Sequence, residues 1–364
     1  MTVKDVAAAI EELAPLPYAE DFDNVGLLVG DKDQEVSKIL VTLDTLEKTV
    51  DEAIAKRCNM IVSFHPIIFS GLKKITGKNY VERVVLKCIK NDIAIYSIHT
   101  ALDNVPTGVN KGMCDALGLT ETSILIPKKQ NIKKLVTYVP KNEVIHVREA
   151  LFKAGAGNIG NYDNCSFATK GKGSFRGNEL SNPTIGEKGE VHIEKEVQLH
   201  ITFEAHKERQ VINALFDAHS YEEVAYEIYT LDNTQQNIGM GMVGFLPNPM
   251  DEMAFLRLVQ KSFHCGGVRF SELQDKPVEK VAVLGGSGSF AIEAAKASGA
   301  DAFITADLKY HQFYQAEGKI VLVDIGHYES EQYTKNILTQ HLTEKFPNFA
   351  VILSDEDTNP IKYL

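Results

Sequence analysis

A histidine and a glutamate lie four residues apart near the C-terminus, where the apolar run IVLVDIG is followed by the polar segment HYESEQYTKN. On a helix, this spacing places His327 and Glu331 on one face, with their Cβ atoms about 5–6 Å apart. An imidazole and a carboxylate so placed can bind one divalent cation. The simpler alternative is that Glu331 only complements the helix dipole and His327 is a loop residue.

Two upstream segments carry side chains of the same ligand types. SFHPIIF contains His65, and SIHTALDNV contains His99 and Asp103, in each case at or just after the end of a predicted strand. In open α/β sheets, ligands bind beyond the carboxyl ends of the strands. We therefore expect these segments and the His327–Glu331 pair to form one metal site.

The composition is that of an ordinary globular protein. Of the 364 residues, 44% are hydrophobic and 24% are charged, and the length suffices for two or three domains. The net charge of −11 disfavours a broad nucleic-acid binder. No run approaches the roughly 18 apolar residues of a membrane span, and the N-terminal segment does not resemble a secretory signal. The five cysteines form no CxxC pair, which favours reduced thiols and a cytoplasmic location.

Strands and helices alternate in two regions of the chain. This alternation predicts an α/β core with a mainly parallel sheet. The predicted strands of the first region are 38–44, 59–66 and 93–100, and those of the second are 279–288, 301–307, 319–327 and 349–355.

The middle of the chain has a different pattern. Residues 131–238 contain two strand–helix–strand units, which predict an inserted ferredoxin-like α+β domain between core halves 1–130 and 239–364. Within the insert, a stretch rich in Gly, Pro and Ser around Gly171, Gly173 and Gly177 predicts a loop without regular structure.

Six motifs, in order along the chain, resemble the Ngg-interacting-factor-three-like family, whose bacterial members are labelled GTP cyclohydrolase 1 type 2 homologues. They are DNVGLLVG (23–30), SFHPIIF (63–69), HTALDNVPTGVN (99–110), GGSG (285–288), ITADLKYHQ (304–312) and DIGHYESE (324–331). The resemblance implies an α/β core with a dinuclear metal site, assembly into hexameric rings and, for the longer bacterial form, a CutA- or PII-like insert.

The same resemblance implies four metal ligands, His65, Asp103, His327 and Glu331. The family motif has two adjacent histidines before the proline, and here Phe64 takes the place of the first. Phenylalanine offers no donor, so we expect one well-formed cation site, most suited to Zn²⁺, and a weak or absent second site. We also expect the Phe64 ring to lie in an otherwise polar pocket.

Other residues are candidates for the surrounding pocket. His99 is expected to orient the Asp103 loop or to hydrogen-bond one of the metal-ligating side chains, rather than to bind metal itself. Gly286 and Ser287, in GGSG, either cradle a phosphate or line the pocket. Asp307 and His311 are expected to form a hydrogen-bonded pair at its rim, although a second metal site is an alternative.

Three more residues have both a pocket and a structural interpretation. Lys309 either meets an anionic, nucleotide-like ligand or is a solvated surface lysine. Asp23 and Asn24 either face the pocket or only form a turn.

These observations favour a metal-dependent hydrolase, because a cation with open coordination positions activates water near neutral pH. Ring opening of a purine at a C–N bond fits the label of the family, and phosphoester or amide hydrolysis would use the same groups. The alternative is a non-catalytic, ring-shaped metal or ligand sensor. A hexameric assembly is expected in either case, and nucleic-acid binding is disfavoured because the lysine pairs are diluted by acidic residues.

Overall fold

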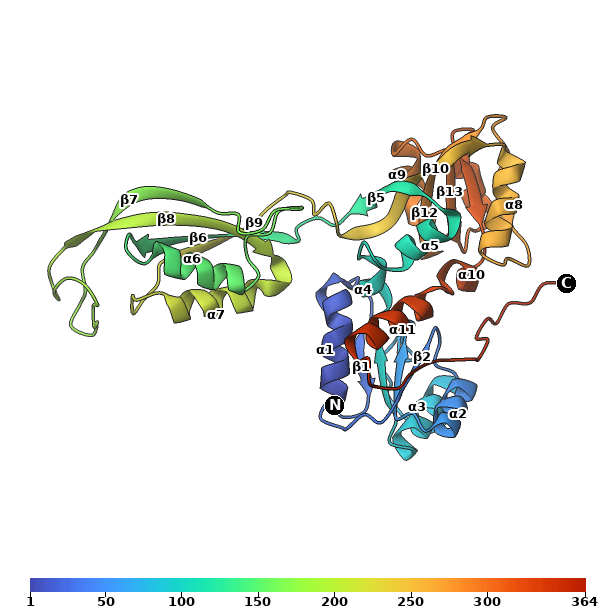
Figure 1. Cartoon of the computed structure of the whole chain (residues 1–364), viewed down its shortest axis with the longest axis horizontal. Coiled ribbons are helices and arrows are strands. Elements are labelled where there is room, and N and C mark those ends of the chain that lie inside the picture. The colour runs from blue at the N-terminus through green and yellow to red at the C-terminus, as the bar shows by residue number, and fades with distance from the viewer. The chain divides into compact units, whose positions relative to one another are not determined.

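The computed structural model describes residues 1–364, which divide into two compact units. The core unit comprises residues 1–126 and 237–364, and the insert unit comprises residues 127–236. Both units combine helices and sheets, so the mixed α/β architecture predicted from the sequence is confirmed (Figure 1). Among the helices, none has the length and apolar character that a membrane crossing requires.

The first sheet of the core unit is five-stranded and mainly parallel, with only β1 antiparallel to its neighbour β4. Every residue of its three central strands is buried, as expected for a sheet that is covered on both faces. In spatial order the strands are β1 (Gly26–Val29), β4 (Ala94–Ser97), β3 (Met60–Ser63), β2 (Ile39–Thr42) and β15 (Val351–Leu353).

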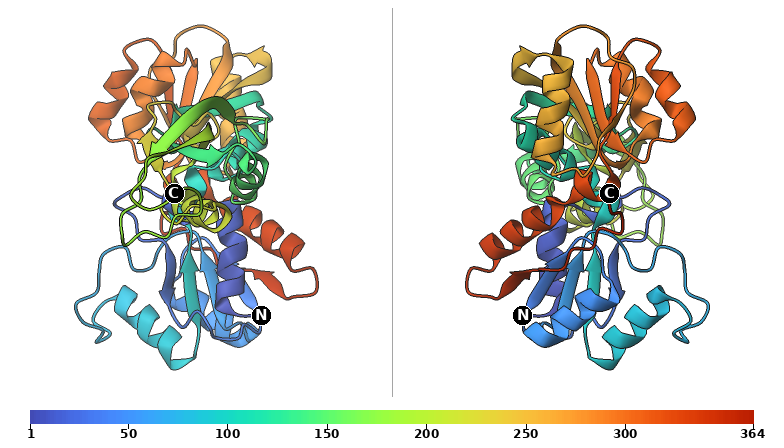
Figure 2. Two further views of the ribbon diagram at one scale, coloured as in Figure 1. Left: turned by 90° about the vertical axis from the view of Figure 1, so that its left-hand side faces the viewer. Right: turned by 90° about the vertical axis from the view of Figure 1, so that its right-hand side faces the viewer.

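Helices from both ends of the chain cover one face of this sheet. Helices α1 (Val3–Leu13) and α11 (Thr334–Lys345) share a hydrophobic cluster with strands β2 and β3, and they lie side by side in Figure 2. Helices α2 (Glu47–Lys56) and α3 (Tyr80–Lys90) form a separate cluster on the other face. The sheet is thus enclosed by apolar layers, which fixes the strand ends that lead to the site.

The last strand does not join the sheet of the second region, to which its place in the sequence assigned it. Strand β15 pairs with β2 of the first sheet, in parallel register. Conversely, β5 (Thr120–Pro127), which comes from the first half, lies at the edge of the second sheet. The two halves of the core therefore exchange strands, because α11 leads the chain back across the first sheet before β15 begins.

The second sheet of the core unit is six-stranded. Its centre is parallel from β12 to β14, and β10 and β11 flank this centre in antiparallel pairing. Helices α5 (Val109–Leu117) and α8 (Glu252–Ser262) pack on one face, and α9 (Ile292–Ala297) packs on the other. In spatial order the strands are β11 (Arg269–Phe270), β14 (Val321–Asp324), β13 (Ala302–Ala306), β12 (Val278–Ser287), β10 (Gly239–Met250) and β5.

The insert unit consists of one four-stranded antiparallel sheet and two helices. Both helices share a single hydrophobic cluster with the sheet, and so they cover one of its faces. Strand β8 lies between β7 and β6, so its backbone is paired on both sides. Along the chain the elements are β6 (Ile132–Pro140), α6 (Val144–Lys153), β7 (Phe167–Phe175), β8 (His192–Glu204), α7 (Glu208–Ala218) and β9 (Tyr226–Thr230), and the strand order is β7-β8-β6-β9.

Part of the glycine-rich stretch is a strand, contrary to the prediction of a loop. Gly171 and Gly173 lie within β7, which pairs with β8 from Phe167 to Phe175. Ladder hydrogen bonds along the partner strand outweigh the poor strand propensity of glycine. The irregular part of the stretch is the long connection from β7 to β8 (Figure 1).

Candidate metal centre

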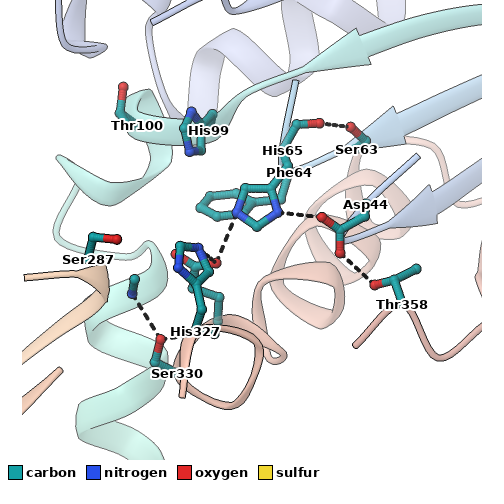
Figure 3. Close-up of polar contacts among 12 residues, drawn as sticks. Asp44, Ser63, Phe64, His65, His99, Thr100, Ser287, His327, Ser330 and Thr358 are labelled. Atoms are coloured by element: carbon teal, nitrogen blue, oxygen red, sulfur yellow. Dashed lines mark hydrogen bonds and ion pairs between the residues drawn. The ribbon is translucent and has the colours of Figure 1, made fainter. Parts of the chain in front are cut away.

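Three ligand-type side chains from distant parts of the core unit converge. His65 follows strand β3, and both His327 and Glu331 lie in the short helix α10 (His327–Glu331). One potential ligand atom of each residue lies within 4.8 Å of the others. The Nε2 atoms of His65 and His327 are 3.0 and 3.2 Å from Oε2 of Glu331. Figure 3 shows the imidazole rings of His65 and His327 close to each other.

Each of the two imidazoles is held at its other nitrogen by a carboxylate. Nδ1 of His65 is 2.8 Å from Oδ1 of Asp44, and Nδ1 of His327 is 2.7 Å from Oδ2 of Asp307. A carboxylate at Nδ1 fixes the ring orientation and leaves Nε2 as the ligand atom, as in many metal sites. Asp307 therefore pairs with His327 and not, as the sequence spacing suggested, with His311.

Backbone pairing of the first sheet places Asp44 beside His65. The His65 amide donates to the carbonyl of Leu43, 3.0 Å away, just beyond the parallel ends of β2 and β3. The segment after β15 then supports this pair, because the Thr358 hydroxyl donates to Oδ2 of Asp44 at 2.6 Å. His65 is thus oriented by residues from two other parts of the chain.

The GGSG segment packs against helix α10. The amides of Gly285 and Gly286 donate to Asn110 Oδ1 and Ser330 Oγ, at 3.0 and 2.9 Å. Gly286 has a φ of +66°, and a Cβ there would lie 2.5 Å from Oε1 of Glu331. These two amides are already used, so they are not a phosphate cradle; the glycines allow close approach to the buried glutamate.

Asp103 ends the short helix α4 (His99–Asp103) and points a carboxylate oxygen into the same region. Its Oδ1 and Oε2 of Glu331 are buried without a well-aligned hydrogen bond from any donor. Nearby, a Cβ at Gly108 would lie 1.8 Å from the carbonyl oxygen of Leu102, so only glycine allows the turn into α5. Buried, unsatisfied carboxylate oxygens are uncommon, and a cation would satisfy both of them.

The charges of this cluster strongly perturb one another. Burial opposes ionisation of Glu331, but the His65 and His327 imidazoles lower its pKa to about 2. Burial also opposes protonation of these imidazoles, yet the surrounding carboxylates raise the pKa of His65 to about 10 and that of His327 to about 11. Burial and the charge of Glu331 raise the pKa of Asp103 well above its usual range. The carboxylates thus create a strong local preference for positive charge.

His99 has the same carboxylate partnership as the other two histidines. Its Nδ1 is 2.8 Å from Oδ1 of Asp23, and the Thr100 amide donates to Oδ2 of Asp23 at 3.1 Å. Burial opposes ionisation of Asp23, but hydrogen bonds from His99 and Thr100 lower its pKa to about 2. Asn24 has a structural role, because its side chain donates to the carbonyl of Ile68 in the loop after His65.

Phe64 does not occupy a polar pocket, so that expectation is wrong. Its side chain is fully buried in the hydrophobic cluster that includes Ala101 and Leu102. The ring centroid lies 5.0 Å from that of His65 and 5.4 Å from that of His99. Phe64 therefore forms an apolar backing for two imidazoles of the site.

A cavity of about 220 Å³ opens onto the cluster. Its walls combine the polar groups of His99, Asp103, Ser287, His327 and Glu331 with apolar side chains, and no lysine or arginine lines it. Three aromatic rings at its mouth, those of Phe22, Phe69 and Phe290, are more than half exposed, at 66%, 52% and 59%. Lys309 and His311 lie outside the lining, and His311 instead packs against Tyr310 and Tyr314.

Sequence reasoning did not identify several residues that hold the site together. Asp44 ends a predicted strand, which was a usable signal, but nothing marked it as the partner of His65. Thr358 carried no signal, because it acts through one contact with a residue far away in the sequence. Asn110 ends the motif 99–110, but nothing in the motif marked its contact with Gly285. Such partners depend on the order of the strands and on the path of the C-terminal segment.

Comparison with known proteins gives matches along nearly the whole chain. The model of the family Duf34/NIF3 (NGG1p interacting factor 3) matches residues 1–360. A Bacillus subtilis (strain 168) protein named GTP cyclohydrolase 1 type 2 homolog is 40% identical over 367 residues, covering 99% of this chain and 98% of that protein. A protein of the same name from Halalkalibacterium halodurans is 35% identical over 365 residues, with coverages of 99% and 98%.

Solved structures give the same result. A Bacillus cereus protein related to NIF3 superposes with a TM-score of 0.87 at 37% identity, covering 100% of this chain and 99% of that one. The Staphylococcus aureus protein SA1388 superposes with a TM-score of 0.81 at 30% identity, with the same coverages of 100% and 99%.

Proposed function

This chain belongs to the Duf34/NIF3 family, as its motifs predicted, and we propose that it is a metal-dependent hydrolase with its active site at the His65, His327 and Glu331 cluster. The observation that carries the proposal is the convergence of two carboxylate-held imidazoles on one buried glutamate oxygen. The donor set of histidine and carboxylate suits Zn²⁺ best, with Mn²⁺ and Fe²⁺ as competitors.

The donor set would hold a first cation between the Nε2 atoms of His65 and His327 and the carboxylate of Glu331. The buried Oδ1 of Asp103 has no donor of its own and supports a role as a further ligand. When bound, the cation would polarise a substrate and lower the pKa of water. Phe64 supplies no donor, so a second cation would depend on Asp103, Glu331 and groups across the cleft.

The remaining polar groups of the cleft have separate roles in this proposal. His99 faces the cavity and is bound through Nδ1 to Asp23, so Nε2 is available to accept or donate a proton. Ser287 shares Asp307 with His327 and would orient that carboxylate. The aromatic rings at the mouth would exclude water from a flat substrate.

The wall of the cleft favours a neutral, planar substrate portion. Aromatic rings and apolar side chains make up much of the lining, while lysine and arginine are absent from it. A heterocycle or amide with a hydrolysable C–N bond would fit these walls, and the curated relatives carry the name GTP cyclohydrolase 1 type 2 homolog. Phosphate groups, if present, would have to lie outside the lining or contact the cation.

The test begins with metal analysis of the purified protein and of His327→Ala and Asp103→Ala. Both variants should lose bound metal, and unchanged occupancy in both would refute the site. The metal-loaded protein is then screened against nucleotides and amides, with the metal-free protein as control. Turnover that requires metal supports a hydrolase. Full metal occupancy without turnover across the screen would favour the alternative, a metal or ligand sensor.

His99 provides a sharper test of catalysis. His99→Gln should lower turnover while bound metal per chain stays constant, because the side chain is assigned to proton transfer. A parallel loss of one metal equivalent would instead make His99 a ligand. His311→Gln is the matched control, since this exposed histidine lies outside the cleft and should change neither quantity.

We also propose that the insert unit is ferredoxin-like and that the protein assembles as a homohexamer. The alternating order of strands and helices and the β7-β8-β6-β9 sheet support the first part. Strand β9 leaves an open sheet edge with Tyr226 and Tyr229 exposed, which supports a contact between copies. Light scattering should give about six times the chain mass, and a monomer would refute the assembly.

A further inference from the structure

A second cavity lies entirely within the insert unit, on the face of its sheet that the helices leave free. Its volume is about 740 Å³, which is within the usual range for small-molecule sites. Side chains alternate along a strand, so Tyr138, Glu196 and Gln198 project away from the hydrophobic cluster under α6 and α7. The floor of the cavity is therefore polar, although the sheet has an apolar opposite face.

Two glycines of β7 make the room for this cavity. Gly171 lies opposite Glu196, and a Cβ at Gly171 would meet nothing within 4 Å. A Cβ at Gly173 would lie 1.9 Å from Oε2 of Glu196, so only glycine leaves this carboxylate in place. Glycine weakens a strand interior and often marks a close approach of a ligand, which explains the glycine-rich motif in functional terms.

The connection between β7 and β8 covers the cavity and is tied down. The Asn182 amide donates to Oε2 of Glu222 at 2.6 Å, and the Thr184 hydroxyl donates to the carbonyl of Ser220 at 2.8 Å. Phe175, from the end of β7, packs edge-on against Tyr221 at a centroid distance of 5.8 Å. These contacts thus hold the β7–β8 connection over the cavity, and it brings aromatic and apolar side chains to the cavity wall.

The free charged group of the floor is a carboxylate oxygen. Glu196 is only 8% exposed; its Oε1 accepts from the Tyr221 hydroxyl at 2.9 Å, and its Oε2 makes no hydrogen bond within the chain. Gln198 donates one amide hydrogen to Tyr138 Oη at 3.3 Å, which leaves its carbonyl oxygen and its second amide hydrogen free. Burial and Glu196 raise the pKa of Tyr221, so the phenol keeps its proton and remains the donor.

We propose that this cavity binds an organic cation that carries N–H donors, such as an amidinium, guanidinium or ammonium group on an apolar body. The buried Glu196 carboxylate receives the charged group, and the rings of Phe175 and Tyr221 contact the apolar part. Lys170, Lys172 and Arg176 also belong to the lining, together with the carboxylates of Glu222 and Glu223. Lys170 and Lys172 alternate with Gly171 along β7, so their side chains point away from Glu196, and Arg176 is exposed. The site is separate from the metal centre, and its existence does not depend on the proposed hydrolase activity.

Calorimetric titration of the full-length protein tests this site with benzamidine, agmatine and spermidine. The neutral analogue benzamide, which has the shape of benzamidine, tests the role of charge. At least one cation should bind, and benzamidine should bind more tightly than benzamide. If no cation binds, or if benzamide binds as well as benzamidine, the proposal is wrong.

Three variants locate the binding. Glu196→Gln keeps an acceptor for Tyr221 and should weaken cation binding about tenfold, since it removes the charge assistance. Glu194→Gln, two residues earlier on the same strand face but outside the cavity lining, is the control and should bind as the parent. Gly171→Val should fold normally and abolish binding, because its side chain fills open space. Cation binding that is unchanged in both Glu196→Gln and Gly171→Val would place it elsewhere and refute the assignment.

Discussion

Replacing Asp44 by alanine should weaken metal binding without unfolding the protein. The Asp44 carboxylate lies 2.8 Å from Nδ1 of His65, and nothing else holds that nitrogen. Loss of such a partner typically lowers metal affinity about 10- to 100-fold, because the ring loses its orientation and some basicity. We expect Asp44→Ala to lower the metal affinity by a factor near the upper end of this range. Asp44→Asn, which keeps an acceptor without the charge, should lower the metal affinity about tenfold.

The other carboxylate partner offers an internal comparison. The Asp44 side chain is 30% exposed, whereas the Asp307 side chain, which holds His327, is 49% exposed. Solvent screens the more exposed pair, so Asp307→Ala should lower the affinity less than Asp44→Ala. Thr358→Val removes one hydrogen bond to Asp44 and should weaken binding about fivefold, as expected for about 1 kcal/mol.

The assay is competition for Zn²⁺ against a chromophoric chelator, with thermal unfolding of the metal-free proteins in parallel. Asp251→Ala is the control: Asp251 caps helix α8 by accepting from the amides of Met253 and Ala254, so its loss should lower stability by about 1 kcal/mol and leave Zn²⁺ affinity unchanged. Parental Zn²⁺ affinity in folded Asp44→Ala would refute the argument. So would an equal loss of affinity in Asp251→Ala, because the effect would then follow general stability.

Three further outcomes are expected. Phe64→His should raise bound metal per chain, and in chelator it should destabilise the fold by about 1–3 kcal/mol because a polar ring replaces a fully buried apolar one; two full-occupancy cations in the parent protein would contradict the reasoning. Gly286→Ala should reduce the Zn²⁺ affinity more than the stability of the fold, because its Cβ would lie 2.5 Å from Oε1 of Glu331 and would displace that oxygen. Parental Zn²⁺ affinity by chelator competition would show that the close approach at Gly286 is not needed. A chain in which a short linker joins residue 128 to residue 238 should keep its metal and form a smaller assembly by light scattering; a folded, metal-free product would show that the insert unit contributes to the site.

Local patterns in the sequence were sufficient to predict several features of the fold and of the candidate site. Alternation of strands and helices predicted the mixed α/β architecture, because hydrophobic periodicity reports directly on which faces are buried. The spacing of His327 and Glu331 predicted that both would lie on one helix face, and the structure places His327 Nε2 3.2 Å from Glu331 Oε2. The ordered motifs predicted the family, which the match over residues 1–360 confirms.

Features that depend on distant contacts were decided by tertiary structure. Asp307 lies four residues from His311 in the sequence, yet its partner is His327, because the ends of β13 and β14 lie side by side in the second sheet. The glycine-rich stretch became strand β7 because β8 offers a continuous ladder of backbone hydrogen bonds. In both cases, a contact with residues far away in the sequence outweighed the preference of the neighbouring residues along the chain.

The support of the metal centre shows this difference most clearly. The sequence alone determined that ligand-type residues follow strands and that His327 and Glu331 share a helix face, since strand ends and helical spacing are local properties. Only the tertiary structure decided that Asp44 and Thr358 hold His65, because this contact requires β2 beside β3 and a C-terminal segment that returns across the first sheet. Neighbours along the chain are set by covalent geometry, whereas these partners are set by which apolar surfaces pack together.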